Sequence, residues 1–214
     1  MPTTTTLLAF ALVSLGMVLT PGPNMIYLIS RSITQGRIAG LISLGGVALG
    51  FVFYMLCAAF GITALVFAVP LAYDALCYAG AAYLLWLAWQ AVKPGGQSPF
   101  QVKKLPVDGP KKLFAMGLVT NLLNPKIAIM YMALIPQFIA PEHGRVWLQS
   151  LCLGSVQIAV ALTVNGLIVL GAGGIAAFLT GRPLWLRIQR YFMGTMLGGI
   201  AVLVATDHAR PMPA

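Results

Sequence analysis

Two proline motifs interrupt long uncharged segments of the chain, Pro21-Gly22-Pro23-Asn24 and Asn124-Pro125-Lys126. Proline lacks a backbone N–H and clashes with the preceding helical turn, so each motif should break a helix and leave backbone groups unpaired. Hydrocarbon cannot satisfy those groups, and such breaks are tolerated in membranes where they line a cavity. Similar breaks in the two halves of a chain indicate the substrate site of a transporter. The alternative is a pair of ordinary proline kinks, which membrane helices also contain.

Composition predicts the fold class. Of 214 residues, 59% are hydrophobic and 8% are charged, and the mean hydropathy is +0.90, which leaves too little polar surface for a soluble globule. The charged residues separate apolar runs that are long enough to cross a bilayer as helices. We therefore predict an all-α membrane protein without a soluble domain, with six transmembrane helices near residues 7–29, 38–60, 74–92, 113–138, 146–170 and 188–206.

Two of the uncharged runs, 38–73 and 146–181, each contain 36 residues. A straight helix of that length would extend about 54 Å, well beyond a hydrocarbon core of about 30 Å. We expect helix ends at Gly61 and Pro70 in the first run and at Gly171-Ala172-Gly173-Gly174 in the second. The remaining apolar stretches could lie at the interface or form re-entrant segments.

The segment 93–112 is rich in Pro, Gly, Lys and Gln and resembles a linker. It divides a single polytopic domain, 1–214, into half-repeats of about 1–92 and 113–206 with three spans each. An odd number of spans inserts the two halves in opposite directions, which predicts an inverted 3+3 repeat with proline-broken helices 1 and 4. Small-residue spacings such as Gly46-xxx-Gly50 would allow close helix packing, and exposed ones would allow a homodimer.

The formal net charge is +9. The basic residues lie at the ends of apolar runs rather than in a patch interleaved with aromatic residues, so we expect the lipid bilayer and not nucleic acid as a partner. Ten of the 13 lie in alternate loops, which the positive-inside rule makes cytoplasmic, so both termini should be periplasmic. These ten residues are Arg31, Arg37, Lys93, Lys103, Lys104, Lys111, Lys112, Arg182, Arg187 and Arg190.

The motif residues also resemble a known family. Leu19-Thr20-Pro21-Gly22-Pro23-Asn24 leads to Ser30-Arg31 and Gly36, and Asn124-Pro125-Lys126 is followed by Leu134-Ile135-Pro136-Gln137-Phe138. With the length and the six-span layout, these residues are similar to those of the lysine exporter (LysE/RhtB) family of amino-acid efflux transporters. The resemblance implies a transporter, not an enzyme, that exports amino acids or close analogues across the bacterial inner membrane and is driven by proton entry.

This resemblance places the substrate site on the two proline motifs, where suitable groups are available. The amide N–H groups of a broken helix suit a carboxylate, and freed carbonyls with the Asn24 and Asn124 amides could hold an ammonium. Lys126 could pair with the carboxylate and exchange a proton, which makes it the candidate proton-coupling residue. Alternatively, Lys126 could snorkel or form an ion pair, and the asparagines could only cap freed backbone. The predicted substrate-binding residues are Pro21, Gly22, Pro23, Asn24, Asn124, Pro125, Lys126, Tyr131 and Gln157.

The acidic residues restrict the expected substrate. All four, Asp74, Asp108, Glu142 and Asp207, lie near predicted span ends. A dibasic side chain would therefore find no carboxylate partner in mid-membrane. We predict neutral or hydroxylated amino acids, resembling homoserine, threonine or leucine, rather than lysine or arginine.

Other function classes fit the residues less well. A membrane thiol–disulfide electron carrier would need cysteines beside the proline breaks, whereas Cys57, Cys77 and Cys152 are scattered. An intramembrane Ser/His hydrolase would need a base near Ser155, but both histidines lie in loop or terminal segments. The predicted spans lack clusters of His, Cys or carboxylate, so we expect no metal and no cofactor. Export of another small solute is the remaining alternative.

Overall fold

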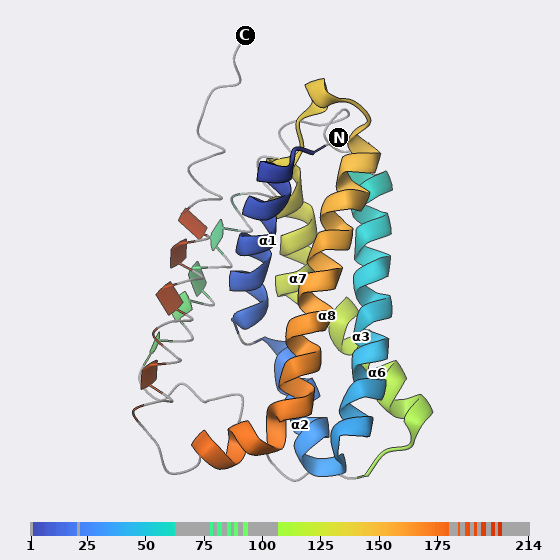
Figure 1. Ribbon diagram of the computed structural model, residues 1–214, viewed down its shortest axis with the longest axis vertical. Helices are drawn as coiled ribbons and strands as arrows, with labels where there is room; N and C mark the ends of the chain where they lie inside the picture. Colours follow the sequence, from blue (N-terminus) through green and yellow to red (C-terminus); the bar gives the residue numbers. More distant parts are fainter. Residues whose placement is uncertain are drawn as a thin grey trace.

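The computed structural model describes residues 2–20, 22–62 and 107–179, with separate residues between 78 and 93 and between 184 and 202. These described residues form helices and no β-strand (Figure 1). The all-α fold predicted from composition is confirmed for this part of the chain. The predicted spans 74–92 and 188–206 and most of the linker 93–112 lie outside the continuously described segments.

The first proline motif separates two helices, α1 (Thr4–Leu19) and α2 (Pro23–Gln35). The Thr3 side chain caps α1 by accepting a hydrogen bond from the Thr6 N–H. α1 ends at Leu19 because the residue before a proline avoids the helical region, and Thr20 is extended with φ −73° and ψ 119°. Pro23 then opens α2 at the first helical position, where its missing N–H removes no helical bond. The two helices meet at an angle of 57°.

The second proline motif separates α6 (Pro110–Leu122) from α7 (Pro125–Ile129). Asn124, which precedes Pro125, is extended and caps α7. Beyond α7 the chain continues as a π-helical turn, η2 (Met130–Leu134), and a 3-10 turn, η3 (Ile135–Phe138). Pro136 has no N–H with which to extend an α-helical ladder there. The predicted break in span 113–138 is confirmed, with a bend of 54°, but the segment after Ile129 is not α-helical.

Two helices run without a proline break. α3 (Arg37–Cys57) continues into a π-helical turn, η1 (Ala58–Ile62), and α8 (Val146–Leu179) follows the short 3-10 turn η4 (Pro141–His143). Gly36 joins α2 to α3 with a φ of +88°, a conformation that favours glycine. The expected helix end at 171–174 was wrong, because α8 continues to Leu179. Glycine weakens a helix interior by only about 1 kcal/mol, and the last turns of α8 bend instead of ending (Figure 1). Of the ends expected in the first run, Gly61 lies within η1, and Pro70 lies outside the described residues.

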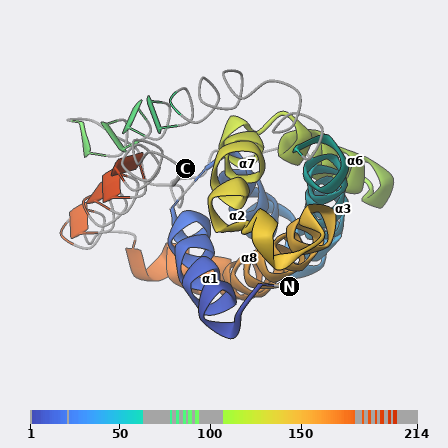
Figure 2. The same ribbon diagram turned by 90° about the horizontal axis from the view of Figure 1, so that it is seen from above.

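The bent pairs run in opposite directions through the bundle. In Figure 1, α1 begins at the top beside the N-terminus and α2 ends at the bottom, whereas α6 lies low and α7 rises toward the top. In Figure 2, seen from above, α2 and α7 both lie near the middle of the bundle, and Figure 1 shows that α7 lies above α2. Among the described residues, two helices are long and apolar enough to cross a membrane, or up to four spans if each bent pair counts as one.

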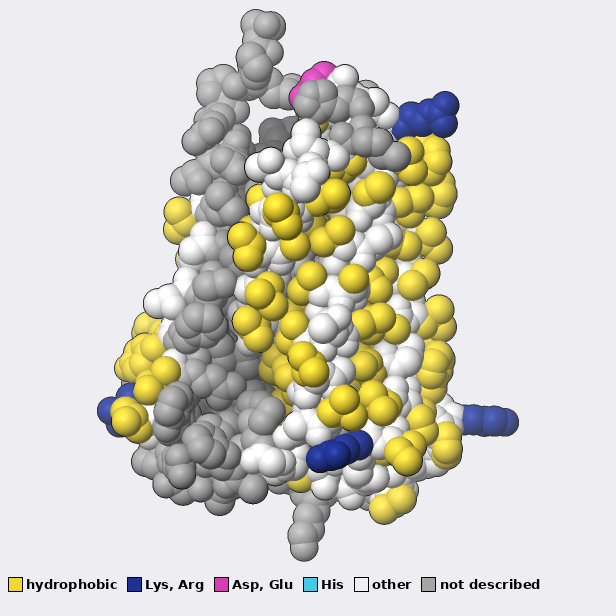
Figure 3. All heavy atoms as spheres, viewed as in Figure 1, with side chains coloured by type: hydrophobic (Ala, Val, Ile, Leu, Met, Phe, Trp, Pro, Cys, Tyr) yellow, Lys and Arg dark blue, Asp and Glu magenta, His cyan; other side chains and the backbone are white. Residues whose placement is uncertain are grey.

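The bundle has a hydrophobic core that also contains buried polar side chains, and its exterior is apolar, unlike that of a soluble protein. Side chains such as Leu12 and Ile38 are 69% and 75% exposed, while Ser14, Asn121 and Gln157 are fully buried. On the face shown in Figure 3, hydrophobic side chains cover the middle and Lys and Arg side chains lie at the two ends. This distribution fits a helical bundle surrounded by lipid, because hydrocarbon solvates leucine and excludes amides.

The closest helix contact, the α3–α6 seam, lies where Ser43, Gly46 and Gly50 of α3 meet Phe114, Gly117 and Asn121 of α6. A Cβ atom on Gly46 would overlap the Phe114 carbonyl oxygen, and one on Gly117 would overlap the Ser43 carbonyl oxygen. The two backbones therefore touch directly. The packing role predicted for the Gly46-xxx-Gly50 spacing is confirmed.

Candidate functional site

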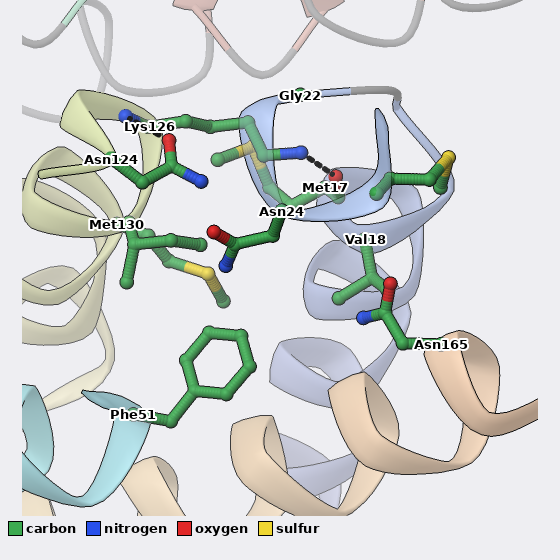
Figure 4. A pocket seen from close by; sticks show the side chains of 11 residues that line it. Met17, Val18, Gly22, Asn24, Phe51, Asn124, Lys126, Met130 and Asn165 are labelled. Atoms are coloured by element: carbon green, nitrogen blue, oxygen red, sulfur yellow. Dashed lines mark hydrogen bonds between the residues drawn. The ribbon is translucent and has the colours of Figure 1, made fainter. Parts of the chain in front are cut away.

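Lys126 connects the two helix breaks. Its ammonium group donates a hydrogen bond to the carbonyl oxygen of Met17 at 2.9 Å, near the end of α1 (Figure 4). It donates a second one to the carbonyl oxygen of Thr20 at 2.6 Å. Only 6% of the residue is exposed. The lysine neither snorkels to an interface nor pairs with a carboxylate among the described residues, which were the two alternatives left open by the sequence.

The first proline motif creates the acceptors that Lys126 uses. In a continuous helix the Met17 carbonyl would accept from the N–H of residue 21, but that residue is Pro21 and has none. The lysine ammonium supplies the missing donor. It also lies at the C-terminal end of α1, where the helix dipole is negative and favours a cation.

Gly22 allows the lysine to lie against the backbone of the first break. A Cβ atom at this position would be 3.3 Å from Lys126 Nζ and 3.4 Å from its Cε. Such contacts are tighter than ordinary van der Waals separation, so any larger residue would push the ammonium away from its two acceptors. Gly22 of the first motif therefore packs directly against the Lys126 side chain of the second motif.

Asn24 and Asn124 place their side-chain amides beside Lys126. Asn124 Oδ1 accepts a hydrogen bond from the Lys126 backbone N–H at 3.1 Å, which is the capping role that the sequence left open for it. Its Nδ2 is buried and has no partner among the residues that the structure describes, and the same holds for Oδ1 and Nδ2 of Asn24. Buried amides normally form hydrogen bonds, so these groups are suited to bind a polar ligand.

A cavity of about 20 Å³ lies between these residues. Its polar lining consists of Asn24, Asn124, Lys126 and Asn165. Its apolar lining consists of Met17, Val18, Met25, Phe51, Ile127 and Met130. This volume holds about one water molecule and is far smaller than the few hundred Å³ of a ligand pocket. The cavity is therefore too small to hold an amino acid.

Tyr131 and Gln157 do not line this cavity. The Tyr131 hydroxyl donates to Gln157 Oε1, and both residues are fully buried. The Tyr131 ring stacks on Tyr54 with centroids 5.8 Å apart, and the Tyr54 hydroxyl donates to the Leu122 carbonyl at 2.7 Å. These residues form a separate buried layer that joins η2, α3 and α8.

Two of the other sequence-predicted residues lie in the first turns after the breaks. Pro23 and Pro125 open α2 and α7, and Pro21 lies outside the described residues. Sequence reasoning did not assign Phe51 or Asn165 to the site. Asn165 gave a weak signal as a polar residue in an uncharged run, whereas Phe51 gave none, because apolar residues fill the whole of its helix.

An ionic cluster joins α2 to the start of α6. Arg31 Nη1 lies 2.8 Å from Asp108 Oδ2, and Lys112 Nζ lies 2.7 Å from Asp108 Oδ1. Gln35 Nε2 donates to the Asp108 carbonyl at 2.9 Å. The hydrogen bond from Lys112, together with the charges of Lys112 and Arg31, holds the pKa of the Asp108 carboxyl below its usual value despite partial desolvation. This cluster joins α2 to the start of α6 at one end of the bundle.

We expect Asp108→Asn to lower the melting temperature of the detergent-solubilised protein at pH 7. Because the folded-state pKa of Asp108 lies below the unfolded one, its carboxylate stabilises fully above the unfolded pKa of about 3.9 and loses that effect as the pH falls through the folded pKa. The difference between wild type and variant should therefore shrink below about pH 4. Scanning fluorimetry at pH 7 and below about pH 4 measures this difference in melting temperature. Glu142→Gln, at an exposed position, is the control and should match wild type. A difference of equal size at both pH values would contradict the ion pair.

The chain also matches a known protein family. Residues 15–208 match the model of the LysE type translocator. The chain belongs to the LysE type translocator family. The family resemblance seen in the two proline motifs is thereby confirmed, and this member of the LysE family is a membrane transporter. No solved structure matches it.

Relatives of this LysE-family protein include proteins named for efflux. It is 29% identical over 201 residues to the homoserine/homoserine lactone efflux protein of Salmonella typhimurium, covering 94% of this chain and 97% of the relative. It is 24% identical over 202 residues to the leucine efflux protein of an Enterobacter species, covering 90% and 91%. It is also 29% identical over 207 residues to a membrane protein of Vibrio cholerae, covering 94% and 97%.

Proposed function

We propose that this LysE-family protein exports neutral amino acids across the bacterial inner membrane in exchange for protons. The proposed substrates are hydroxylated or aliphatic, like homoserine, threonine or leucine. Two relatives named for homoserine and leucine efflux support the substrate class. In this proposal the chain is one domain of six spans in two inverted halves, with both termini periplasmic. The opposite directions of the two bent pairs support the inversion (Figure 1).

The binding of the Lys126 ammonium to the Met17 and Thr20 carbonyls carries this proposal. Those two acceptors suit any ammonium group, including the α-ammonium of an amino acid. The unpaired amide groups of Asn24 and Asn124 supply N–H donors beside them, which suit the α-carboxylate. The site can thus recognise the two charged groups that all amino acids share, with Lys126 in the place of the substrate when the site is empty.

Competition for those carbonyls explains proton exchange. A buried site with two carbonyl acceptors stabilises one ammonium and not two, because like charges repel strongly at low dielectric. When the substrate ammonium binds from the cytoplasm, Lys126 is displaced and gives its proton to that side. When the substrate leaves outward, Lys126 takes a proton from the outer side and rebinds the carbonyls. One substrate leaves for each proton that enters.

The size of the cavity fits a closed stage of this cycle. A space for about one water molecule cannot hold an amino acid, so substrate entry requires Lys126 to leave and the lining to move. Three methionines, Met17, Met25 and Met130, form part of that lining. Their unbranched side chains repack easily and would let the cavity enlarge around different substrates.

Efflux from cells tests the function directly. Cells that express the protein would be loaded with amino acids by dipeptide uptake, and the appearance of each amino acid outside would be followed over time. We expect faster efflux of a few neutral amino acids than from cells without the protein, with collapse of the proton gradient abolishing the difference. Efflux of no amino acid by well-expressed protein would contradict the proposal and favour another solute. Faster efflux of lysine than of any neutral amino acid would contradict the substrate class.

Gly22→Ala should slow export several-fold without lowering the amount of protein in the membrane. The added methyl would lie 3.3 Å from Lys126 Nζ, which forces a shift of a few tenths of an ångström and weakens both hydrogen bonds. Initial efflux rates at matched protein levels measure the effect. Gly109→Ala is the control, since a Cβ there meets no atom within 4 Å, and it should export at the wild-type rate. Equal rates for the two variants would contradict the contact between Gly22 and Lys126.

A further inference from the structure

One wall of the cavity carries a polar group that the proposed mechanism does not use. Asn165 of α8 lines the cavity and is only 4% exposed. Its Nδ2 donates a hydrogen bond to the Ala161 carbonyl one turn earlier, at 2.8 Å. This bond orients the amide, because only the nitrogen can donate. The Oδ1 atom has no hydrogen-bond partner among the described residues and is left as an acceptor.

The surroundings of Asn165 are apolar. In Figure 4, Asn165 and Phe51 lie on the opposite side of Asn24 from Lys126, and Val18 lies beside Asn165. The lining of the cavity contains no carboxylate. An amino acid whose charged groups lie at Met17, Thr20 and Asn124 would thus direct its side chain toward a mostly apolar wall with a single acceptor.

Each class of side chain would meet that wall differently. A hydroxyl group can donate to Oδ1 and satisfy it. An aliphatic side chain of the same size fills the space but leaves a buried acceptor unpaired, which costs about 1–3 kcal/mol. A second ammonium would be buried without a counter-charge, which costs far more. The wall therefore favours hydroxylated substrates, tolerates aliphatic ones and excludes dibasic ones.

We propose that Asn165 is the specificity-determining residue of this site, with Oδ1 accepting a hydrogen bond from the side-chain hydroxyl of the substrate. The inference rests on the proposed function and deepens it, because it selects among neutral amino acids. Asn165 acts on the substrate side chain, whereas Lys126 acts on the ammonium that all substrates share. Changes at the two positions should therefore have different effects: one on the choice of substrate and one on export as a whole.

The test compares homoserine with norvaline, which have side chains of the same length that end in a hydroxyl and a methyl group. Both would be loaded into cells, and the ratio of their initial efflux rates would be measured for wild type and Asn165→Leu. Wild type should export homoserine about 10-fold faster, as expected for one unpaired buried acceptor. Asn165→Leu should lower homoserine export while keeping or raising norvaline export, so that the ratio falls to about one or below.

Thr163→Leu provides the matched control, because Thr163 is exposed on the same helix two residues earlier. It should keep the wild-type ratio. If wild type exports both amino acids and Asn165→Leu slows both by the same factor, Asn165 has only a structural role and the specificity proposal is wrong while the transport function stands. If wild type exports neither, the proposed function itself fails. A wild-type preference for norvaline would also overturn the proposal.

Discussion

Lys126→Met should abolish amino-acid efflux while the protein remains in the membrane at its normal level. Methionine has a similar length and apolar stem but cannot donate to the Met17 and Thr20 carbonyls. Each hydrogen bond to a charged group contributes about 1.5–3 kcal/mol, so the loss of both corresponds to a fall of about 100-fold or more. Efflux after dipeptide loading, compared at equal amounts of membrane protein, measures the change.

Two further variants separate the roles of charge and proton exchange. Lys111→Met is the matched control, because Lys111 is an exposed lysine in the first turn of α6, and its efflux should equal that of wild type. Lys126→Arg keeps a positive charge for the two carbonyls but cannot release its proton at any physiological pH. Efflux should therefore also be lost in the arginine variant. Full activity of Lys126→Arg would eliminate proton exchange at this residue, and full activity of Lys126→Met would eliminate its role in transport altogether.

The positions of the helix breaks could be predicted from the sequence because proline acts locally. A missing N–H and a clash with the preceding turn have the same effect in any fold, so Thr20 and Asn124 are extended as expected. The acceptor at Met17 could be found by the same logic, since it lies four residues before Pro21. Local rules do not identify the hydrogen-bond donor to the Met17 carbonyl, because only the three-dimensional arrangement brings Lys126 to that carbonyl.

The rotation of each helix about its axis could not be predicted. In a soluble protein the apolar stripe of a helix marks the buried face, but α8 is apolar on all sides because lipid and protein interior have similar polarity. Gln157 and Asn165, eight residues apart, could therefore not be told apart as site residues, and only Asn165 reaches the cavity.

The α3–α6 seam affects how such a transporter can move. α3 precedes the segment 63–106 and α6 follows it, yet their backbones touch at Gly46 and Gly117. Sliding or tilting one helix on the other would force atoms into overlap, since packed backbones do not deform continuously. The short α7, which carries Lys126 and begins at the second break, is thus better suited to move against a fixed pair of α3 and α6.

Gly46→Ala should destabilise the folded protein by about 3 kcal/mol or more, because the new methyl would overlap the carbonyl oxygen of Phe114 and backbone cannot move aside as a side chain can. Its neighbour offers a matched control. A Cβ on Gly45 would lie 3.5 Å from the Phe114 ring, an ordinary contact, and alanine is the better helix former, so Gly45→Ala should be neutral or slightly stabilising. Thermal unfolding in detergent and recovery of monodisperse protein measure both variants. Equal melting temperatures for the two would mean that α3 and α6 can separate, and the seam would then no longer hold α3 fixed against α6.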